Sequence, residues 1–551
     1  MKGRHEGSVR PGRTPMKRSR CLAFAVLGLF ALSSCAVGPN YRAPPPPPGP
    51  GFVPEGTLAA PTTASSGVGG EAQHFVETLD IPGQWWTLFQ SSDLNDLIAQ
   101  ALAHNPTLEA AQASLRQANE TALAGRGALS PSVSAGYQVT REKASGEQFG
   151  LPQLGSFLYT LNSASVNVSY TIDAFGGVRR QVESLRAQAD YQRYALEASY
   201  LALTANVVTA AITEASLREQ IAATERIAQD QRQQLDISQK RFDAGGTSRA
   251  DVLQQQAALQ STLASLPPLR TQLAQQRTLL ATYVGKLPAD YAGAEFKLET
   301  LTLPTDLPVS VPSKFIEQRP DVQQYEALLH QSVAQIGVAT ANMLPQLTLQ
   351  ASGGADSLAF SDLFGPGTVI WSLIGGATQP VFKGGQLLHQ RRAAVAAAQA
   401  AAANYKATVL SAFQDVANTL YALQGDADTL AANVLAERSA ADSLALVELQ
   451  YKAGGASFLQ VLTAEQNHQT AAISLVKARA QRFADTAALF QALGGGWWNR
   501  SDPGARPQNA IPAPSFGDSS FSSPAPGLSR PAPAAALQDV GTASSRSSTG
   551  S

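Results

Sequence analysis

Segments with a period of two recur at four places along this chain. Residues 132–140 and 163–173 alternate apolar side chains with Ser, Asn, Gln and Thr, and residues 346–352 repeat the pattern. A less regular apolar run, residues 369–374, follows a loop rich in glycine and aspartate. This period predicts strands of a sheet with one apolar face and one polar face that meets water. At about ten residues each, they could cross a bilayer as tilted barrel strands, although alone they would fit a soluble sandwich edge equally well.

Two very long helical segments separate these strands. Residues 178–243 contain no proline or glycine and are dominated by Ala, Gln, Leu, Arg and Glu, which predicts a helix of roughly 65 residues, or roughly 100 Å. An imperfect heptad-like stripe runs from Leu203 to Leu235. Residues 386–452 match this helix in length, with one interruption at Gly425. Because alanine is abundant, we expect close packing on more than one side, as in the wall of a tube. A two-stranded coiled coil would need more Leu and Ile at its seam.

Each long helix stops at a Gly-Gly pair and restarts at once. The pairs are Gly245-Gly246 and Gly454-Gly455, and the residues near the new N-caps are Thr247 and Ser457. Glycine ends helices and Ser or Thr begins them, so the pattern predicts two tight helical hairpins. The return arms span residues 247–285 and 457–493. Pro267-Pro268 is expected to kink or break the first arm.

The chain therefore carries one long module twice. Asn105-Pro106 and Arg319-Pro320 each open a helix before a strand pair, and related Gly-Gly turns recur roughly 210 residues apart. This distance indicates duplication of a whole module rather than a short-repeat array. We predict a first repeat at residues 71–300 and a second at residues 301–499.

The two ends are predicted to lie outside these repeats. A basic stretch and a short apolar stretch lead to Leu32-Ser33-Ser34-Cys35, which predicts a lipoprotein signal at residues 1–34 and acylation of Cys35. The alternative is an ordinary signal peptide that happens to contain this cysteine. Residues 35–70 are predicted to be a lipid anchor and Pro-rich spacer. Residues 500–551, rich in Pro, Ser and Ala, are predicted to be a disordered tail.

Composition excludes several function classes. The net charge is −1, with no basic patch to favour a nucleic-acid partner. The six histidines stand apart without metal-ligand spacing, and no nucleotide-binding or hydrolase motif occurs. Trp85-Trp86 and Trp497-Trp498 could be interfacial anchors, but packing against the helices is favoured. We therefore expect no catalytic site, no metal and no cofactor other than the covalent lipid on Cys35.

Four strands cannot close a barrel, and an open edge is not tolerated in lipid. If these strands are transmembrane, the chain must oligomerise. Three copies would supply twelve strands, but the pattern alone requires only more than one copy.

A series of motifs in order resembles one family over nearly the whole mature body. The motifs are Cys35 with Gly38-Pro39-Asn40-Tyr41, Trp85-Trp86, Asn105-Pro106, Asp173-Ala174-Phe175-Gly176, Leu266-Pro267, Arg319-Pro320-Asp321-Val322, Pro380-Val381-Phe382-Lys383-Gly384-Gly385 and Ala492-Leu493-Gly494-Gly495-Gly496-Trp497. The chain resembles the TolC-like, NodT-type outer membrane factor lipoproteins of RND-type tripartite efflux systems. Each motif is weak alone, but the ordered set is specific.

The resemblance implies a mainly α fold with transmembrane β-strands. In this fold, a homotrimer joins a 12-strand β-barrel in the outer membrane to a 12-helix α-barrel in the periplasm, with a mixed belt around it. The family conducts small molecules outward, docks a periplasmic adaptor and, through it, an inner-membrane RND-type pump. Outer-membrane lipid is the remaining partner.

The resemblance also assigns roles to the hairpin tips. Adaptor docking falls on Arg241, Phe242, Gly245, Gly246, Thr247, Ser248, Tyr451, Gly454, Gly455 and Ser457. The family often places gate acids six and nine residues after the first glycine of the second tip, which here are Gln460 and Thr463, both uncharged. The first hairpin does have an acid at the sixth position, Asp251. A polar gate is therefore expected, without an acidic ring at Gln460 and Thr463.

Three functions compete. The leading hypothesis is a passive outer-membrane exit duct of an efflux pump for drugs or toxic compounds. A type I secretion duct for proteins is a related alternative. The third, a lipid-anchored periplasmic scaffold or adaptor, would not need four amphipathic strands. Neither the cargo nor the partner pump can be predicted from the sequence.

Overall fold

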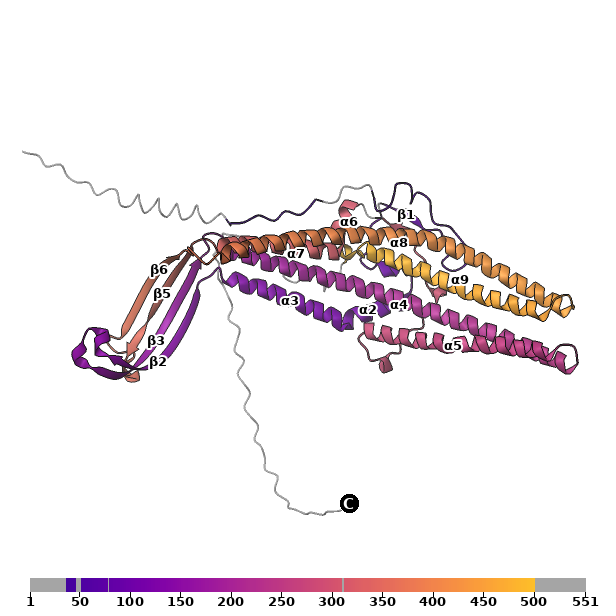
Figure 1. Ribbon diagram of the computed structural model, residues 1–551, viewed down its shortest axis with the longest axis horizontal. Helices are drawn as coiled ribbons and strands as arrows, with labels where there is room; N and C mark the ends of the chain where they lie inside the picture. Colours follow the sequence, from indigo (N-terminus) through magenta and orange to yellow (C-terminus); the bar gives the residue numbers. More distant parts are fainter. Residues whose placement is uncertain (1–35, 46–50, 78, 310–311, 501–551) are drawn as a thin grey trace, which may run out of the picture. The chain divides into compact units, whose positions relative to one another are not determined.

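The computed structural model describes residues 36–45, 51–77, 79–309 and 312–500 (Figure 1). The predicted signal peptide, the predicted acylation site Cys35 and the predicted tail from residue 501 onward lie outside the described residues. Residues up to Arg500 form one compact unit, and the description below concerns that unit.

The second half of the chain repeats the element order of the first. The first repeat contains α2 (Ser92–His104), α3 (Pro106–Gly127), β2 (Ser132–Ser145), β3 (Ser156–Ile172), α4 (Gly177–Asp243) and α5 (Arg249–Tyr283). The second contains α6 (Pro312–Gln318), α7 (Pro320–Ala341), β5 (Gln346–Ser357), β6 (Val369–Thr378), α8 (Gln386–Lys452) and α9 (Phe458–Ala492). Matched helices have equal lengths: α3 and α7 have 22 residues, α4 and α8 have 67, and α5 and α9 have 35. The predicted internal duplication is confirmed.

Local signals set where the helices begin. Asn105 caps α3, because its side-chain oxygen accepts hydrogen bonds from the amides of Thr107 and Leu108 at 3.0 and 3.2 Å. Pro106 fits the first turn, where no partner for its nitrogen is needed. At the start of α4, the Asp173 carboxylate accepts from the amides of Val178 and Arg179, both at 3.0 Å. A carboxylate at this position also complements the positive end of the helix dipole.

The four long strands form one antiparallel sheet in the order β2-β3-β5-β6. The pairings are continuous, with Val133 opposite Val168, Val168 opposite Ala351, and Ala351 opposite Leu373. A separate two-stranded parallel sheet joins β1 (His74–Val76) to β4 (Asp306–Pro308). This small sheet belongs to the belt region predicted around the helices.

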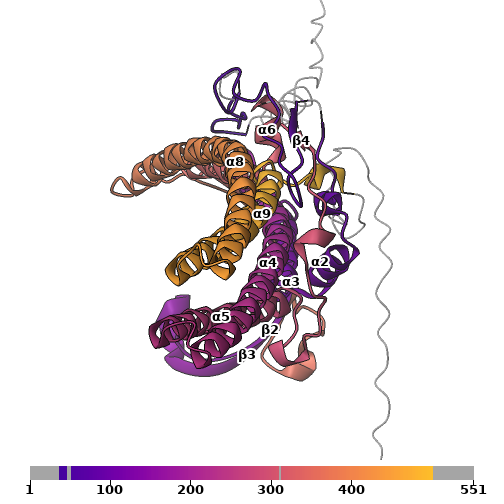
Figure 2. The ribbon, with the colours of Figure 1, turned by 90° about the vertical axis from the view of Figure 1, so that its right-hand side faces the viewer.

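The long helices pack as two hairpins. The first hairpin is α4 with α5, and the second is α8 with α9. Figure 2 shows α9 between α8 and α4, in agreement with the contacts of α4 with both α5 and α9. One 18-residue window of α4 is apolar enough by composition to cross a membrane, but half of it is buried inside the protein. Its hydrophobicity is explained by packing between neighbouring helices.

The main hydrophobic core lies in the belt, where the N-terminal region meets the middle of the helices. Trp85 and Phe89 are fully buried there, and the Trp85 ring stacks on Phe490 with 5.4 Å between ring centroids. Trp86 is also buried in this core. The preference for packing over membrane anchoring is therefore confirmed for Trp85-Trp86.

Three local expectations need correction. Helix α5 continues through Pro267-Pro268, so a break does not occur there, while the alternative expectation of a kink stays a prediction. The Pro-rich spacer predicted within residues 35–70 packs on the folded body from residue 51 onward: Phe52 lies edge-on to Phe315 with 4.9 Å between ring centroids, and Thr62 is buried. Tertiary contacts, which composition does not reveal, order this segment. The strands also extend beyond the alternating patterns, since β2 reaches Ser145.

Candidate functional site

The sheet has two chemically different faces. Because side chains alternate along each strand, the observed register aligns residues of one kind across all four strands. One row contains Val133, Val168, Ala351 and Leu373, and the adjacent row on the opposite face contains Ser134, Asn167, Ser352 and Ser372. The apolar face is exposed in the single chain, and Trp371 and Leu373 on it are 79% and 74% exposed. An exposed apolar face beside a polar one fits the wall of a membrane barrel.

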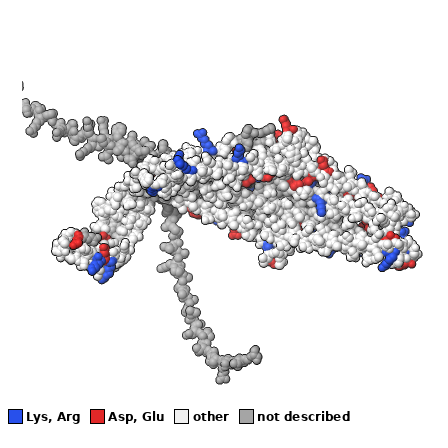
Figure 3. Space-filling view, viewed as in Figure 1, with Lys and Arg blue, Asp and Glu red and all other residues white. Residues whose placement is uncertain are grey.

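Charge is confined to the loop end of this sheet. Among the residues of these strands, the charged ones are Arg141, Glu142 and Lys143 in β2 and Asp356 in β5. Register places them beside the loops that join β2 to β3 and β5 to β6. On the face shown in Figure 3, the remaining length of the strands carries no charged side chain. Each strand thus has an uncharged stretch of the length needed to cross the hydrocarbon layer.

The sheet is open at both sides. In the described part of the chain, β2 pairs only with β3 and β6 pairs only with β5. The outer edges of β2 and β6 therefore present unpaired backbone N–H and C=O groups. In a membrane these groups would need partners from another strand.

The two hairpin tips are closely similar turns. Gly245 and Gly454 adopt positive φ angles of 76° and 79°. The following glycine donates its amide back into the helix, from Gly246 to the carbonyl of Arg241 at 2.7 Å and from Gly455 to that of Gln450 at 2.8 Å. Glycine is required because other residues are strained in the left-handed region. Both turns have open space around the glycine that begins them.

Two of the three gate candidates are used to cap the return helices. Asp251 accepts hydrogen bonds from the amide and hydroxyl of Ser248, at 3.1 and 2.8 Å, and these bonds lower its pKa. Gln460 occupies the same position in the second hairpin, where its side-chain oxygen accepts from the amide of Ser457 at 2.7 Å. Asp251 and Gln460 are thus equivalent capping-box residues. Thr463 is exposed and donates its hydroxyl to the carbonyl of Leu459 at 2.9 Å.

The tips contact one another through aromatic residues. The Arg241 guanidinium lies 4.8 Å from the centre of the Tyr451 ring, which joins the first hairpin to the second. Tyr451 also packs against Phe458, with 5.8 Å between ring centroids, and Arg249 lies 5.7 Å from the Phe242 ring. The structure thus brings Arg241 and Tyr451 together, while Gly246, Thr247, Ser248 and Ser457 stay within their own turns.

The model of the family described as "Outer membrane efflux protein" matches residues 97–286 and 311–495. This chain belongs to that family. The chain is 30% identical to nodulation protein T of Rhizobium leguminosarum bv. viciae, covering 86% of this chain and 93% of the relative. It is 28% identical to the pyoverdine export outer membrane protein OpmQ of Pseudomonas putida, covering 88% and 98%. The outer-membrane channel OprN superposes with a TM-score of 0.77 at 24% identity, covering 84% of this chain and all of that one.

Family membership confirms the outer-membrane factor fold and the role as an efflux exit duct. The family is one of channels rather than enzymes, and it places the efflux protein in the outer membrane. Among the described residues, no group of three or more His, Cys, Asp and Glu is arranged to hold a metal. The candidate functional surfaces are the sheet, the helical hairpins and their tips.

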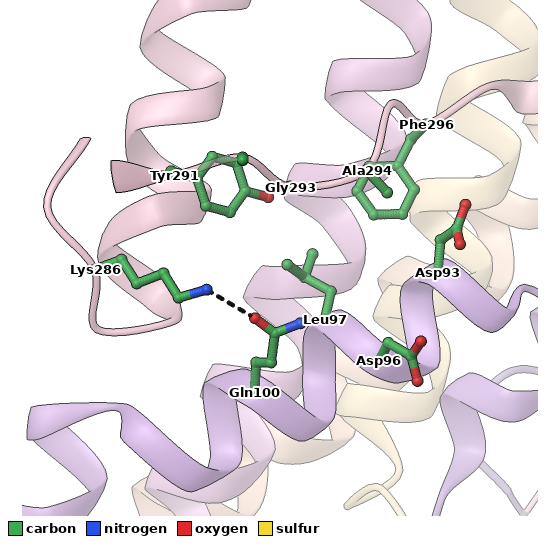
Figure 4. Close-up of a pocket in the computed structure, with 10 residues that line it drawn as sticks. Asp93, Asp96, Leu97, Gln100, Lys286, Tyr291, Gly293, Ala294 and Phe296 are labelled. Atoms are coloured by element: carbon green, nitrogen blue, oxygen red, sulfur yellow. Dashed lines mark hydrogen bonds between the residues drawn. The ribbon is translucent and has the colours of Figure 1, made fainter. Parts of the chain in front are cut away.

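One surface pocket of the efflux protein lies in the belt, between α2 and the loop after α5, and has a volume of about 180 Å³ (Figure 4). Lys286 reaches Gln100 across it, with 3.1 Å between the ammonium and the amide oxygen. Sites for drug-sized ligands are larger, at roughly 300–1,000 Å³. The pocket is a small polar gap in the belt.

The segment that follows Cys35 docks where strand β3 meets helix α4. The Val37 amide donates to the carbonyl of Phe175 at 3.0 Å, and the buried Arg180 donates to the carbonyl of Val37 at 3.2 Å. At Gly38, whose φ is +92°, an added Cβ would lie 2.5 Å from the Cα of Gly337 on α7. A side chain at Gly38 would therefore not fit.

Aromatic and charged groups extend this contact. The Tyr41 ring stacks on His330 with 4.3 Å between centroids, and its hydroxyl donates to Glu326 at 3.1 Å. His330 lies 3.0 Å from Glu183, and this hydrogen bond together with Arg180 lowers the pKa of Glu183. The residues after Cys35 are thus held on the folded body.

Sequence analysis missed one polar layer between the hairpins. Gln231 of α4, Gln255 of α5 and Glu465 of α9 are buried at the same level. Gln231 lies three residues after Ala228, which belongs to the apolar stripe of α4. The spacing of the stripe therefore predicts that the Gln231 side chain faces inward. No comparable signal in the sequence connects it with Glu465.

Proposed function

We propose that three copies of this chain close a twelve-strand barrel in the outer membrane, continued by a helical tube in the periplasm. The observation that carries this proposal is the four-stranded sheet with one apolar face and two unpaired edges. Pairing of β6 from one copy with β2 of the next would satisfy both edges. Twelve is an allowed even number of strands for such barrels.

The duct is passive in this proposal, and a partner pump supplies the energy. We infer that the tip residues from Arg241 to Ser248 and from Tyr451 to Ser457 bind a periplasmic adaptor that links the duct to an inner-membrane RND-type pump. The exposed glycine turns support this role, because small residues allow close approach of partner helices. One relative is a pyoverdine export protein, and this supports small organic molecules as the cargo of the duct.

The tips also form the narrowest part of the duct in this proposal. Asp251 and Gln460 are engaged by Ser248 and Ser457, so they contribute capped, rigid turns rather than free side chains. Thr463 adds an uncharged polar group beside the second turn. We therefore propose a polar gate whose width depends on how the hairpins pack, without a repulsive acidic ring at positions 460 and 463.

Export measurements test the duct itself. In the source bacterium, deletion of the gene is expected to raise accumulation of ethidium several-fold, and the wild-type gene should restore the original level. The reason is that the pump would lose its exit through the outer membrane. Unchanged accumulation of ethidium, of a hydrophobic antibiotic and of an organic solvent after deletion would contradict the proposal.

We further propose that Cys35 carries the lipid that anchors the mature chain. The docking of Val37 and Gly38 at the junction of β3 and α4 supports this, because it fixes the described residues that follow Cys35 on the folded body. Trypsin can cut after the exposed Arg42 to release an N-terminal peptide. We expect mass spectrometry to find that peptide beginning at an acylated Cys35, and Cys35→Ser to abolish the acylation. An unmodified peptide from the wild type would refute the lipid anchor.

A further inference from the structure

The polar layer between the two hairpins is buried and crosses three helices. Gln231 of α4 is 4% exposed, Gln255 of α5 is 0% exposed and Glu465 of α9 is 7% exposed. The first two belong to the first hairpin and Glu465 belongs to the second. Glu465 therefore brings a carboxyl group into the contact between the hairpins.

This layer is short of hydrogen-bond donors. Within the described part of the chain, Oε2 of Glu465 and Oε1 of both Gln231 and Gln255 have no hydrogen-bond partner. The Gln255 amide also donates to the backbone carbonyl of Gln231 at 3.4 Å. A buried acceptor without a donor costs about 1–3 kcal/mol, and an unpaired charge costs more. A proton on Glu465 would add the donor that the layer lacks.

The charges that act on Glu465 are negative. Asp230 of α4 and Glu448 of α8 both oppose its ionisation, and α5 contributes only the neutral Gln255. On the same helix as Glu465, His468 lies beside Glu437 of α8, with 3.6 Å between the imidazole Nε2 and the carboxylate Oε1. Burial is the largest cause that raises the pKa of Glu465, while hydrogen bonds from Gln255 and Gln231 act in the opposite direction. Ionisation of Glu465 is thus unfavourable as long as the hairpins stay packed.

Two further hydrogen bonds join the hairpins near this layer. Gln234 donates to Glu448 at 3.1 Å, and Thr262 donates to Gln469 at 3.4 Å. Nearer the belt, the ion pair of Arg479 with Glu219 at 3.2 Å joins α9 to α4 beside the large apolar core. The half of the contact nearer the tips, where Arg241 also contacts Tyr451, lacks that ion pair and therefore depends more on the state of Glu465.

We propose that Glu465 makes the packing of the two hairpins sensitive to protons: the protonated side chain holds them together and the ionised one loosens them. The proposal rests on the proposed duct, in which this packing sets the width of the periplasmic end. Ionisation would then favour opening, and acid would favour closure.

The sign of the effect follows from proton linkage. A hydrated Glu465 in parted hairpins would titrate near its ordinary pKa of 4.5, whereas the pKa is raised in the packed state. The packed state therefore binds the proton more tightly. Packing is strongest below pH 4.5, weakens as the pH rises towards the raised pKa, and stays weakened above it.

Amide hydrogen exchange tests the layer directly. At pH 7, amides at residues 462–470 are expected to exchange several-fold faster in the wild type than in Glu465→Gln, which keeps the shape and removes the charge. At pH 4.5 the two proteins should exchange at the same rate. Because the two proteins are compared at equal pH, the dependence of the chemical exchange rate on pH cancels. Equal rates at pH 7, or a difference that persists unchanged at pH 4.5, would overturn the proposal.

The matched control is Asp426→Asn. Asp426 lies in the belt region on α8, and burial, followed by its interaction with Asp485, raises its pKa to about 8. This variant removes a second carboxyl group whose pKa is raised, and amide exchange at residues 462–470 should remain as in the wild type. Single-channel conductance separates the two proposals. If exchange responds as expected but no variant conducts at any pH, the layer is established and the duct is refuted.

Discussion

Replacing Leu373 with arginine is expected to abolish assembly in the outer membrane. Leu373 lies near the middle of β6 on the apolar face, and its side chain is 74% exposed in the single chain. A cationic residue on the lipid face near the bilayer midplane costs roughly 2–4 kcal/mol, and a trimer would incur that cost three times. The heat-sensitive oligomer on unboiled gels should be lost, together with the protein in the outer-membrane fraction.

The matched control is the neighbouring residue. Ser372 belongs to the polar row with Ser134, Asn167 and Ser352, on the other face of the same strand. Ser372→Arg should therefore assemble at close to wild-type levels, since the charge would face water. Normal assembly of Leu373→Arg, or equal loss in both variants, would show that the apolar face does not meet lipid.

Lengthening the second tip is expected to stop efflux while the oligomer still forms. Four residues inserted between Gly454 and Gly455 would displace the turn that Gly455 closes with Gln450, and would disturb the stacking of Arg241 on Tyr451. Because the sheet and the belt core lie elsewhere in the chain, assembly should persist. Accumulation of ethidium should rise to within about twofold of the level in the deletion strain.

The same four residues inserted after Leu287 provide the control. Leu287 is 71% exposed in the belt loop that follows α5, so an insertion there is expected to be tolerated. Efflux should remain close to that of the wild type. If the tip insertion also left efflux intact, adaptor docking at the tips would be wrong.

Local signals made the helices and their turns predictable from the sequence. Helix α8 spans residues 386–452 as expected, because Gly385 and Gly454 adopt positive φ at its two ends. The interruption expected at Gly425 was wrong, since the helix continues through that residue. The polar side chains of Arg141 to Lys143 ended the alternating pattern, although the backbone of β2 continues to pair as far as Ser145. Strand extent depends on the partner strand, which a single alternating segment does not reveal.

Long-range contacts account for the rest. Pro267-Pro268 did not interrupt α5, because packing against α4 sustains the helix despite the missing amides. Phe52 lies in a stretch rich in proline and glycine, but its ring packs against the rings of Phe315 and Phe413. The layer at Glu465 needs three residues from three helices, so it emerges only from the fold. The two hairpin turns, by contrast, followed from the Gly-Gly pairs and the Ser and Thr residues after them.

Single-particle imaging of the detergent-extracted, mature protein tests directly whether three copies form a closed duct. We expect a particle with threefold symmetry, a closed barrel of twelve strands and a continuous helical tube of roughly 100 Å. The β6 edge of one copy should pair with the β2 edge of the next. A monomeric particle, or a rod without a lumen, would contradict the duct and favour a lipid-anchored scaffold.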